Sequence, residues 1–155
     1  AFKSCGLTKV TFPANLKTIG ERAYYANKGL TSLSFPSSLQ TIGNNAFINN
    51  KYLESVNIST VKNVGAGIFF NCKKLKSVKL PLTLTKLSSY NFVDYPNGFF
   101  GNCKSLKSYT IPKNIKTLGD MCFAGSGLKE ITIPKTVKKV GKVCFSIAKS
   151  LQRLQ

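Results

Sequence analysis

The chain has 155 residues, of which 43% are hydrophobic, and this size and composition suit one domain with a sizeable core. It contains no run of 18 apolar residues that would span a membrane. It carries 23 Lys and Arg against 5 Asp and Glu, so its net charge of +18 at pH 7 favours acidic partners such as nucleic acid, a sulfated glycan or an anionic surface. Histidine is absent, which excludes serine or cysteine triads built on imidazole and removes the commonest metal ligand.

A motif that starts on leucine recurs along the chain. The starts are Leu7, Leu30, Leu53, Leu75, Leu106, Leu128 and a seventh at Leu151. An apolar residue follows three and again five positions after each of the first six leucines, and proline comes next in five of these six units. Alternating apolar residues favour a strand, and proline ends it because proline has no N–H to continue the ladder. We therefore predict a short strand from each leucine to the proline, as in residues 30–36.

The second half of each unit carries another apolar pair, usually a glycine, and a closing aromatic residue. The closing aromatic residues are Tyr24, Phe47, Phe69, Phe100, Phe123 and Phe145. We predict that the apolar pair packs on the opposite wall and that the glycine permits the bend that turns the chain back. One unit cannot bury its own apolar face, so stacked units should share an interior, with parallel strands about 4.8 Å apart.

The recurring pattern L-x-x-V-x-I-P-x-x-L-x-x-I-G-x-x-A-F-x-x-C resembles the BspA-type leucine-rich repeats, and the resemblance covers residues 2–151. It implies a right-handed, curved leucine-rich repeat solenoid that is mostly β, with one parallel sheet and six repeats of about 23 residues. It also implies a surface protein of bacteria or protozoan parasites. We expect residues 1–155 to form a single leucine-rich repeat domain, within a longer protein because both ends fall inside the pattern.

The five cysteines occupy two positions of the repeat. Cys5, Cys72 and Cys103 lie three residues after a closing aromatic, and Cys122 and Cys144 lie one residue before one. Other units place small or apolar residues at these positions, which favours a buried small hydrophobe or a turn thiol with a weak hydrogen bond over a zinc site; no C-x-x-C motif is present. Disulfides between Cys72 and Cys103, or between Cys122 and Cys144, are the alternative, because neighbouring units lie about 5 Å apart.

Lysines also recur at fixed positions. Lys28, Lys51, Lys73, Lys104 and Lys149 lie four residues after a closing aromatic, and we call them the lysine ladder. A second line follows the proline turns: Lys17, Lys62, Lys116 and Lys138, with Lys113, Lys135 and Lys139 nearby. The ladder is interpreted either as a multivalent strip for polyanions or as a solvated edge that keeps a repeat protein soluble.

The fourth unit is 31 residues long, and its excess lies at residues 88–98. Insertions in repeat arrays map to loops and often to binding faces. This one contains Tyr90, Phe92, Asp94 and Tyr95, and Pro96-Asn97-Gly98 predicts a turn. The insertion is therefore either a recognition loop or a loop whose aromatic side chains fold back as a small satellite cluster.

The predicted function is binding and not catalysis, because the sequence shows no acid–base pair, phosphate loop or metal cluster, and we expect no cofactor. The resemblance implies a cell-surface or secreted adhesion protein whose partner is a protein or an acidic glycan on another cell or on matrix. A structural spacer and a cytoplasmic protein-interaction scaffold are the alternatives. Dedicated nucleic-acid recognition is not expected, since no recognisable module is present. No oligomeric state follows from the sequence.

Overall fold

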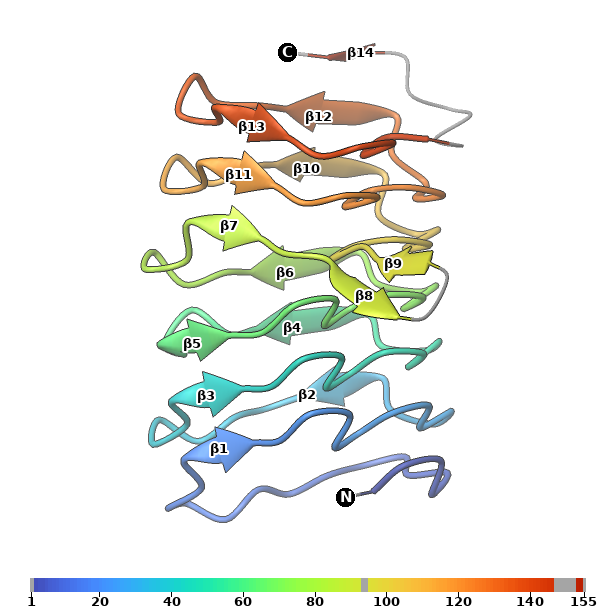
Figure 1. Ribbon diagram of the computed structural model, residues 1–155. Helices are drawn as coiled ribbons and strands as arrows, with labels where there is room; N and C mark the ends of the chain where they lie inside the picture. The colour runs from blue at the N-terminus through green and yellow to red at the C-terminus, as the bar shows by residue number, and fades with distance from the viewer. Residues whose placement is uncertain (1, 93–94, 147–152, 155) are drawn as a thin grey trace.

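The computed structural model describes residues 2–92, 95–146 and 153–154. The chain winds into a stack of similar coils, and its two ends lie at opposite ends of the stack (Figure 1). Strands of neighbouring coils pair in parallel, and no helix occurs in the described ranges. The predicted, mostly β solenoid of stacked repeats is confirmed.

The first line of strands follows the opening leucines. It consists of β2 (Ser32–Leu33), β4 (Ser55–Asn57), β6 (Ser77–Lys79), β10 (Ser108–Thr110), β12 (Glu130–Thr132) and β14 (Arg153–Leu154). Their register follows the repeat, with Val56 paired to Leu33 on one side and Val78 on the other. These apolar residues are buried while their neighbours are exposed, as alternation along a strand requires. The strand predicted at residues 7–13 does not form.

A second line of two-residue strands lies on the opposite wall, where the sequence indicated only packing. It consists of β1 (Thr18–Ile19), β3 (Thr41–Ile42), β5 (Asn63–Val64), β7 (Lys86–Leu87), β11 (Thr117–Leu118) and β13 (Lys139–Val140). Ile42 pairs in register with Ile19 and is buried, whereas Thr41 stands on the outside. The structure thus adds a second parallel line to the predicted one, and the apolar residues of both lines face a shared core.

The repeated glycines serve close approach between coils, and not the bend that was predicted. Gly43 and Gly65 have no left-handed backbone. A Cβ atom on Gly65 would lie 2.6 Å from the backbone nitrogen of Asn44 in the preceding coil, and one on Gly43 would lie 2.6 Å from that of Glu21. Any side chain at these positions would push the coils apart.

The bends are made by left-handed residues on either side of the closing aromatic. Asn45 (φ 53°) and Asn49 (φ 63°) flank Phe47, two positions before and two after it. The same two positions are left-handed around Tyr24 and Phe123. Asparagine and glycine tolerate this conformation best, which explains the asparagines of the middle units.

The closing aromatic rings stack through the core. The Phe47 and Phe69 centroids are 6.3 Å apart with planes 12° from parallel, and those of Phe69 and Phe100 are 6.0 Å apart at 7°. Phe99 packs edge-on against Phe100 at 4.9 Å. All four rings are fully buried. The stack continues past the insertion, so the extra residues leave the core register unchanged.

The coil with the insertion interrupts both lines of strands. In the described part of the chain no ladder joins β6 to β10 or β5 to β7, so the two lines divide into four three-stranded sheets. The extra residues form an antiparallel hairpin of β8 (Tyr90–Phe92) and β9 (Tyr95–Asn97) (Figure 1). The turn predicted at Pro96-Asn97-Gly98 is wrong, because Pro96 and Asn97 belong to β9. A two-stranded hairpin has free edges, where proline is tolerated.

Candidate functional site

The lysine ladder lies on the turns that follow the closing aromatic residues. Lys28, Lys51, Lys73 and Lys104 are exposed, and Lys149 lies outside the described residues. Backbone hydrogen bonds hold neighbouring turns side by side; for example, the N–H of Ser105 donates to the carbonyl oxygen of Lys73 at 3.0 Å. The ladder lysines therefore stand on one edge of the stack at intervals of about 4.8 Å.

Among the described residues, no acidic side chain forms an ion pair with a ladder lysine. Lys76 pairs with Glu54 at 2.8 Å, and the hydrogen bond and positive charge of Lys76 lower the pKa of the Glu54 carboxyl. The other ion pair of the described residues joins Arg22 to Glu21 at 3.6 Å. Neither pair includes a ladder lysine, so the ladder presents its charge to solvent.

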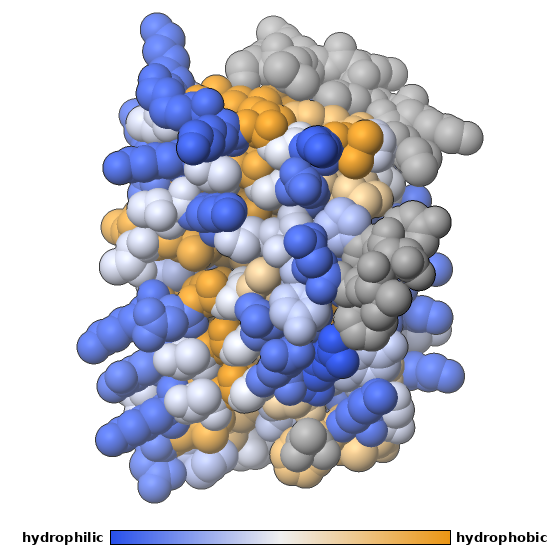
Figure 2. Space-filling view, in the orientation of Figure 1, coloured by the Kyte–Doolittle hydropathy of each residue, from blue (hydrophilic) through white to orange (hydrophobic). Residues whose placement is uncertain are grey.

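A second group of lysines occupies the opposite edge, on the proline turns between the two lines of strands. Lys17, Lys62, Lys116 and Lys138 are exposed, as are Lys113, Lys135 and Lys139. The N–H of Lys138 donates to the carbonyl oxygen of Lys116 at 2.8 Å, so these two turns are also stacked. Figure 2 shows hydrophilic side chains projecting from the left edge, where Figure 1 places the proline turns, and others projecting from the right edge.

The insertion hairpin is attached to the coil through Tyr90. Its hydroxyl donates to Glu21 Oε1 at 3.1 Å, across 69 residues of sequence, and the Arg22 guanidinium lies over its ring at 5.8 Å. Phe92 and Tyr95 are a register pair of the hairpin, but their side chains and Asp94 lie outside the described residues. Of the four candidate recognition residues, the structure therefore places the side chain of Tyr90 alone, against the first coils.

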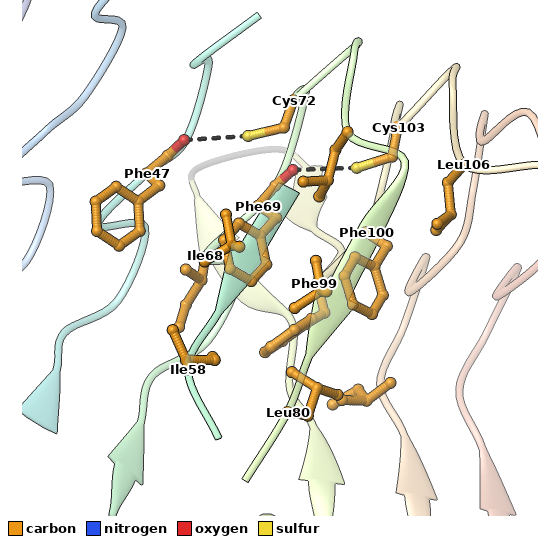
Figure 3. Close-up of a cluster of buried hydrophobic side chains, with 14 of the residues drawn as sticks. Phe47, Ile58, Ile68, Phe69, Cys72, Leu80, Phe99, Phe100, Cys103 and Leu106 are labelled. Atoms are coloured by element: carbon orange, nitrogen blue, oxygen red, sulfur yellow. Dashed lines mark hydrogen bonds between the residues drawn. The ribbon is translucent and has the colours of Figure 1, made fainter. Parts of the chain in front are cut away.

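The cysteines of the middle units act as hydrogen-bond donors. The thiol of Cys72 donates to the carbonyl oxygen of Phe47 at 3.3 Å, and the thiol of Cys103 donates to that of Phe69 at 3.3 Å (Figure 3). In the second unit the Asn50 amide makes the same bond, to the carbonyl oxygen of Tyr24 at 2.8 Å. The sequence analysis missed that asparagine and cysteine share this role, although their alternation at one repeat position was the available signal.

Burial determines the state of the thiols. All five cysteines are free, and all are buried except Cys5. Burial raises the pKa of the Cys72 thiol to about 12 and also raises the pKa of Cys103 and Cys122. The interpretation of the cysteines as buried hydrophobes or turn thiols is confirmed: four are buried, and the exposed Cys5 thiol donates to the carbonyl oxygen of Lys3 at 3.4 Å. The alternative disulfides are not formed.

Metal sites and membrane-spanning helices do not occur in the described ranges. No three His, Cys, Asp or Glu side chains gather there in a way that would hold a metal ion. Nor do these ranges contain a helix long and apolar enough to cross a membrane. The functional candidates that the structure brings forward are thus the two lysine edges and the hairpin.

Stacked coils with parallel strands at every repeat and a continuous apolar interior define the chain as a leucine-rich repeat solenoid. The sequence matches the BspA type leucine rich repeat region in six copies, over residues 1–97 and 96–155, and the chain belongs to this family. Members of leucine-rich repeat families are generally binding modules without catalytic activity. No curated protein sequence matches the chain.

Solved structures show the same fold. A leucine rich cell surface protein from Faecalibacterium prausnitzii is similar, with 23% identity and a TM-score of 0.65 over 94% of this chain and 52% of that one. A Treponema pallidum leucine rich repeat protein has 24% identity and a TM-score of 0.58, over 93% and 52% of the two chains. The pneumococcal vaccine antigen PcpA has 22% identity and a TM-score of 0.53, over 90% and 42%. The chain thus spans about half the length of these proteins.

Proposed function

We propose that the chain is a non-enzymatic adhesion module of a cell-surface or secreted protein, and that the lysine ladder contacts an acidic glycan on a host cell, matrix or another microbe. The observation that carries this proposal is the exposure of Lys28, Lys51, Lys73 and Lys104 on four coils of one edge; none of the four takes part in an ion pair of the described residues. A solvated edge needs charge but does not need it at one position of every full-length turn.

The spacing of the ladder suits a linear polyanion. Coils stack at about 4.8 Å, so four lysines cover roughly 15 Å of the edge. Each contact that neutralises an anionic group releases a counterion, and the gain is summed over the strip. Long lysine side chains adapt to different anion positions, so we expect recognition of charge density and not of one sugar sequence.

The test compares two variants of equal charge. The ladder variant changes Lys28, Lys51, Lys73 and Lys104 to glutamine, and the dispersed variant changes Lys9, Lys17, Lys79 and Lys142 to glutamine. All eight side chains are exposed, so both variants should fold, which circular dichroism checks. Affinity for a heparin-like glycan is measured by calorimetry between 50 and 300 mM salt.

The ladder variant should bind more weakly than the dispersed variant. Its affinity should also depend less on salt: the magnitude of the slope of log affinity against log salt should be smaller by about 3, since each lost contact removes roughly 0.7–0.9. Equal weakening of the two variants would mean that net charge alone governs attraction, and the ladder would then be no more than a solvated edge. Absence of glycan binding by the native chain would favour the structural spacer.

The insertion hairpin is proposed as a recognition loop for a protein partner on the same surface. Its support is the fixed base: Tyr90 is held by Glu21 and Arg22, while Phe92 and Tyr95 pair farther along the hairpin, next to Asp94. Replacing Asn91–Pro96 by a short glycine turn should leave thermal stability nearly unchanged and abolish capture of protein partners from matrix extracts. Unchanged capture by this variant would remove the hairpin from the binding surface.

A further inference from the structure

We infer that the proline turns of the fifth and sixth units form a second polyanion-binding surface, independent of the ladder, so that one chain can bridge two polyanionic glycan strands. We call this surface the proline-turn cluster, and it consists of Lys113, Lys116, Lys135, Lys138 and Lys139. The inference rests on the proposed attraction for acidic glycans, but it does not rest on the ladder.

Local sequence fixes the position of the cluster. The N–H of Ile115 donates to the carbonyl oxygen of Pro112, and the N–H of Val137 donates to that of Pro134, each at 3.0 Å. These bonds close two turns, and each turn carries one lysine directly after its proline and another four residues after it. The Lys138–Lys116 backbone bond of 2.8 Å stacks the two turns, so four ammonium groups stem from two adjacent coils.

Among the described residues, one acid lies beside the cluster, and it does not cancel the charge of five lysines. Asp120 accepts the backbone N–H of Lys142 at 2.8 Å and lines one hollow together with Lys139, but neither ion pair of the described residues includes it. Glu130 lies five residues before Lys135, about 16 Å along β12 and its extension. The Glu130 span exceeds the Debye length of about 8 Å at physiological salt, and five lysines against the one nearby carboxylate of Asp120 leave the cluster with a net positive charge.

A hollow adjoins the cluster on the outer face of β7, β11 and β13. Its volume is about 330 Å³, and its lining includes Lys86 and Lys139 on either side of Thr117, together with one acid, Asp120. The hydroxyl of Thr117 and the two ammonium groups are suitable partners for a sulfate or carboxylate that extends from the turns. The cluster thus offers a shaped surface in addition to charge.

The two lysine surfaces are too far apart to act as one. The strand segment between residues 107 and 113 separates the ladder edge from the proline turns by about 20 Å, which is more than two Debye lengths. The hydrophilic side chains on the left and right edges of Figure 2 point in opposite directions from the apolar interior. A glycan strand on one edge therefore leaves the other edge free for a second strand.

The test uses the ladder variant, the dispersed variant and a cluster variant with Lys113, Lys116, Lys135 and Lys138 changed to glutamine. All three remove four charges. Calorimetry with a sulfated tetrasaccharide, too short to contact both edges, counts the sites per chain. Turbidity with a long sulfated polysaccharide measures bridging. Circular dichroism confirms that each variant is folded.

We expect two sites for the native chain and the dispersed variant, and one site for each of the ladder and cluster variants. Bridging turbidity should be lost in both single-edge variants and retained in the dispersed one. Two sites and full turbidity in the cluster variant would overturn the inference. Loss of a site in the cluster variant alone would keep this surface but contradict the proposed ladder, and equal weakening of all three variants would overturn both.

Discussion

Amide and thiol donors replace one another at the position three residues after the closing aromatic. Asn50 and Cys72 each donate to the carbonyl oxygen of the aromatic residue in the preceding coil. Both residues are fully buried, and a carbonyl without a partner there would be costly. A thiol is a weak donor, but it is small and apolar enough to pack beside the aromatic stack.

The buried thiol of Cys72 makes stability sensitive to alkaline pH. Its pKa is raised to about 12 by burial, whereas an unfolded cysteine titrates near 8.5. Above pH 8.5 the folded state therefore binds more protons than the unfolded state. The contribution of the Cys72 thiol to stability is complete below pH 8.5 and is lost as the pH rises toward 12. Between pH 8.5 and 10 the unfolding free energy of the native chain should fall as the pH rises. In the Cys72→Ala variant this fall should be smaller, by up to about 1.4 kcal/mol per pH unit. Urea titrations measure this; Cys5→Ala, at an exposed position, should leave the fall unchanged.

Left-handed residues store strain that glycine would relieve. Ala26 has φ 55° and donates its N–H to the carbonyl oxygen of Ile48, a bond that glycine would keep. Ala26→Gly should raise the unfolding free energy by about 0.5–1 kcal/mol, because the Cβ clash of the left-handed region disappears. Ala14→Gly, at an exposed residue without positive φ, should give no gain. A loss of stability in Ala26→Gly would contradict the strain argument.

At the scale of the element, the spacing of coils is set by the repeated glycines. Gly65→Ala should destabilise the protein by roughly 1–3 kcal/mol, because the new methyl group would lie 2.6 Å from the Asn44 nitrogen in a packed ladder. Gly20 occupies the same repeat position in the first unit, and a Cβ there would meet nothing within 4 Å. Gly20→Ala is therefore the matched control and should be nearly neutral by thermal denaturation. Equal losses in the two variants would contradict the contact argument, because a methyl group on Gly20 meets no neighbouring atom.

The strands of the first line were predictable because they depend on a local pattern. Val56 and Val78 alternate with polar residues, and proline ends the segment after β6. The second line was harder to predict, since a two-residue strand such as β3 leaves almost no periodicity in the sequence. The role of Gly43 was also missed, because contact with a neighbouring coil is not a local property of the chain.

The candidate site was predictable only in part. The repeat alone gave the positions of exposed lysines such as Lys51 and Lys116, since every coil repeats the same turn. The attachment of Tyr90 to Glu21 joins residues 69 positions apart and follows no repeat, so no pattern indicated it. The stacking of Lys116 and Lys138 into one cluster likewise became visible only when the register was known.

At the scale of the whole molecule, folding concentrates positive charge. Ladder lysines of successive units are 22 to 31 residues apart in sequence but about 4.8 Å apart in the stack. Two unit charges at that distance repel by about 0.9 kcal/mol in water before screening. The described residues contain two ion pairs to set against this repulsion. The fold therefore carries an electrostatic cost that salt should reduce.

The melting temperature of the native chain should accordingly rise as sodium chloride increases from 10 to 150 mM at pH 7, since the Debye length falls from about 30 Å to about 8 Å. Each kcal/mol of screened repulsion should add about 2–4 °C for a chain of this size. The ladder variant should show a smaller rise than the dispersed variant, because adjacent charges contribute more than scattered ones. Scanning calorimetry of the native chain, the ladder variant and the dispersed variant measures these melting temperatures. A melting temperature independent of salt, or the same rise in both variants, would mean that the lysine side chains spread apart enough for the stacked arrangement to cost nothing.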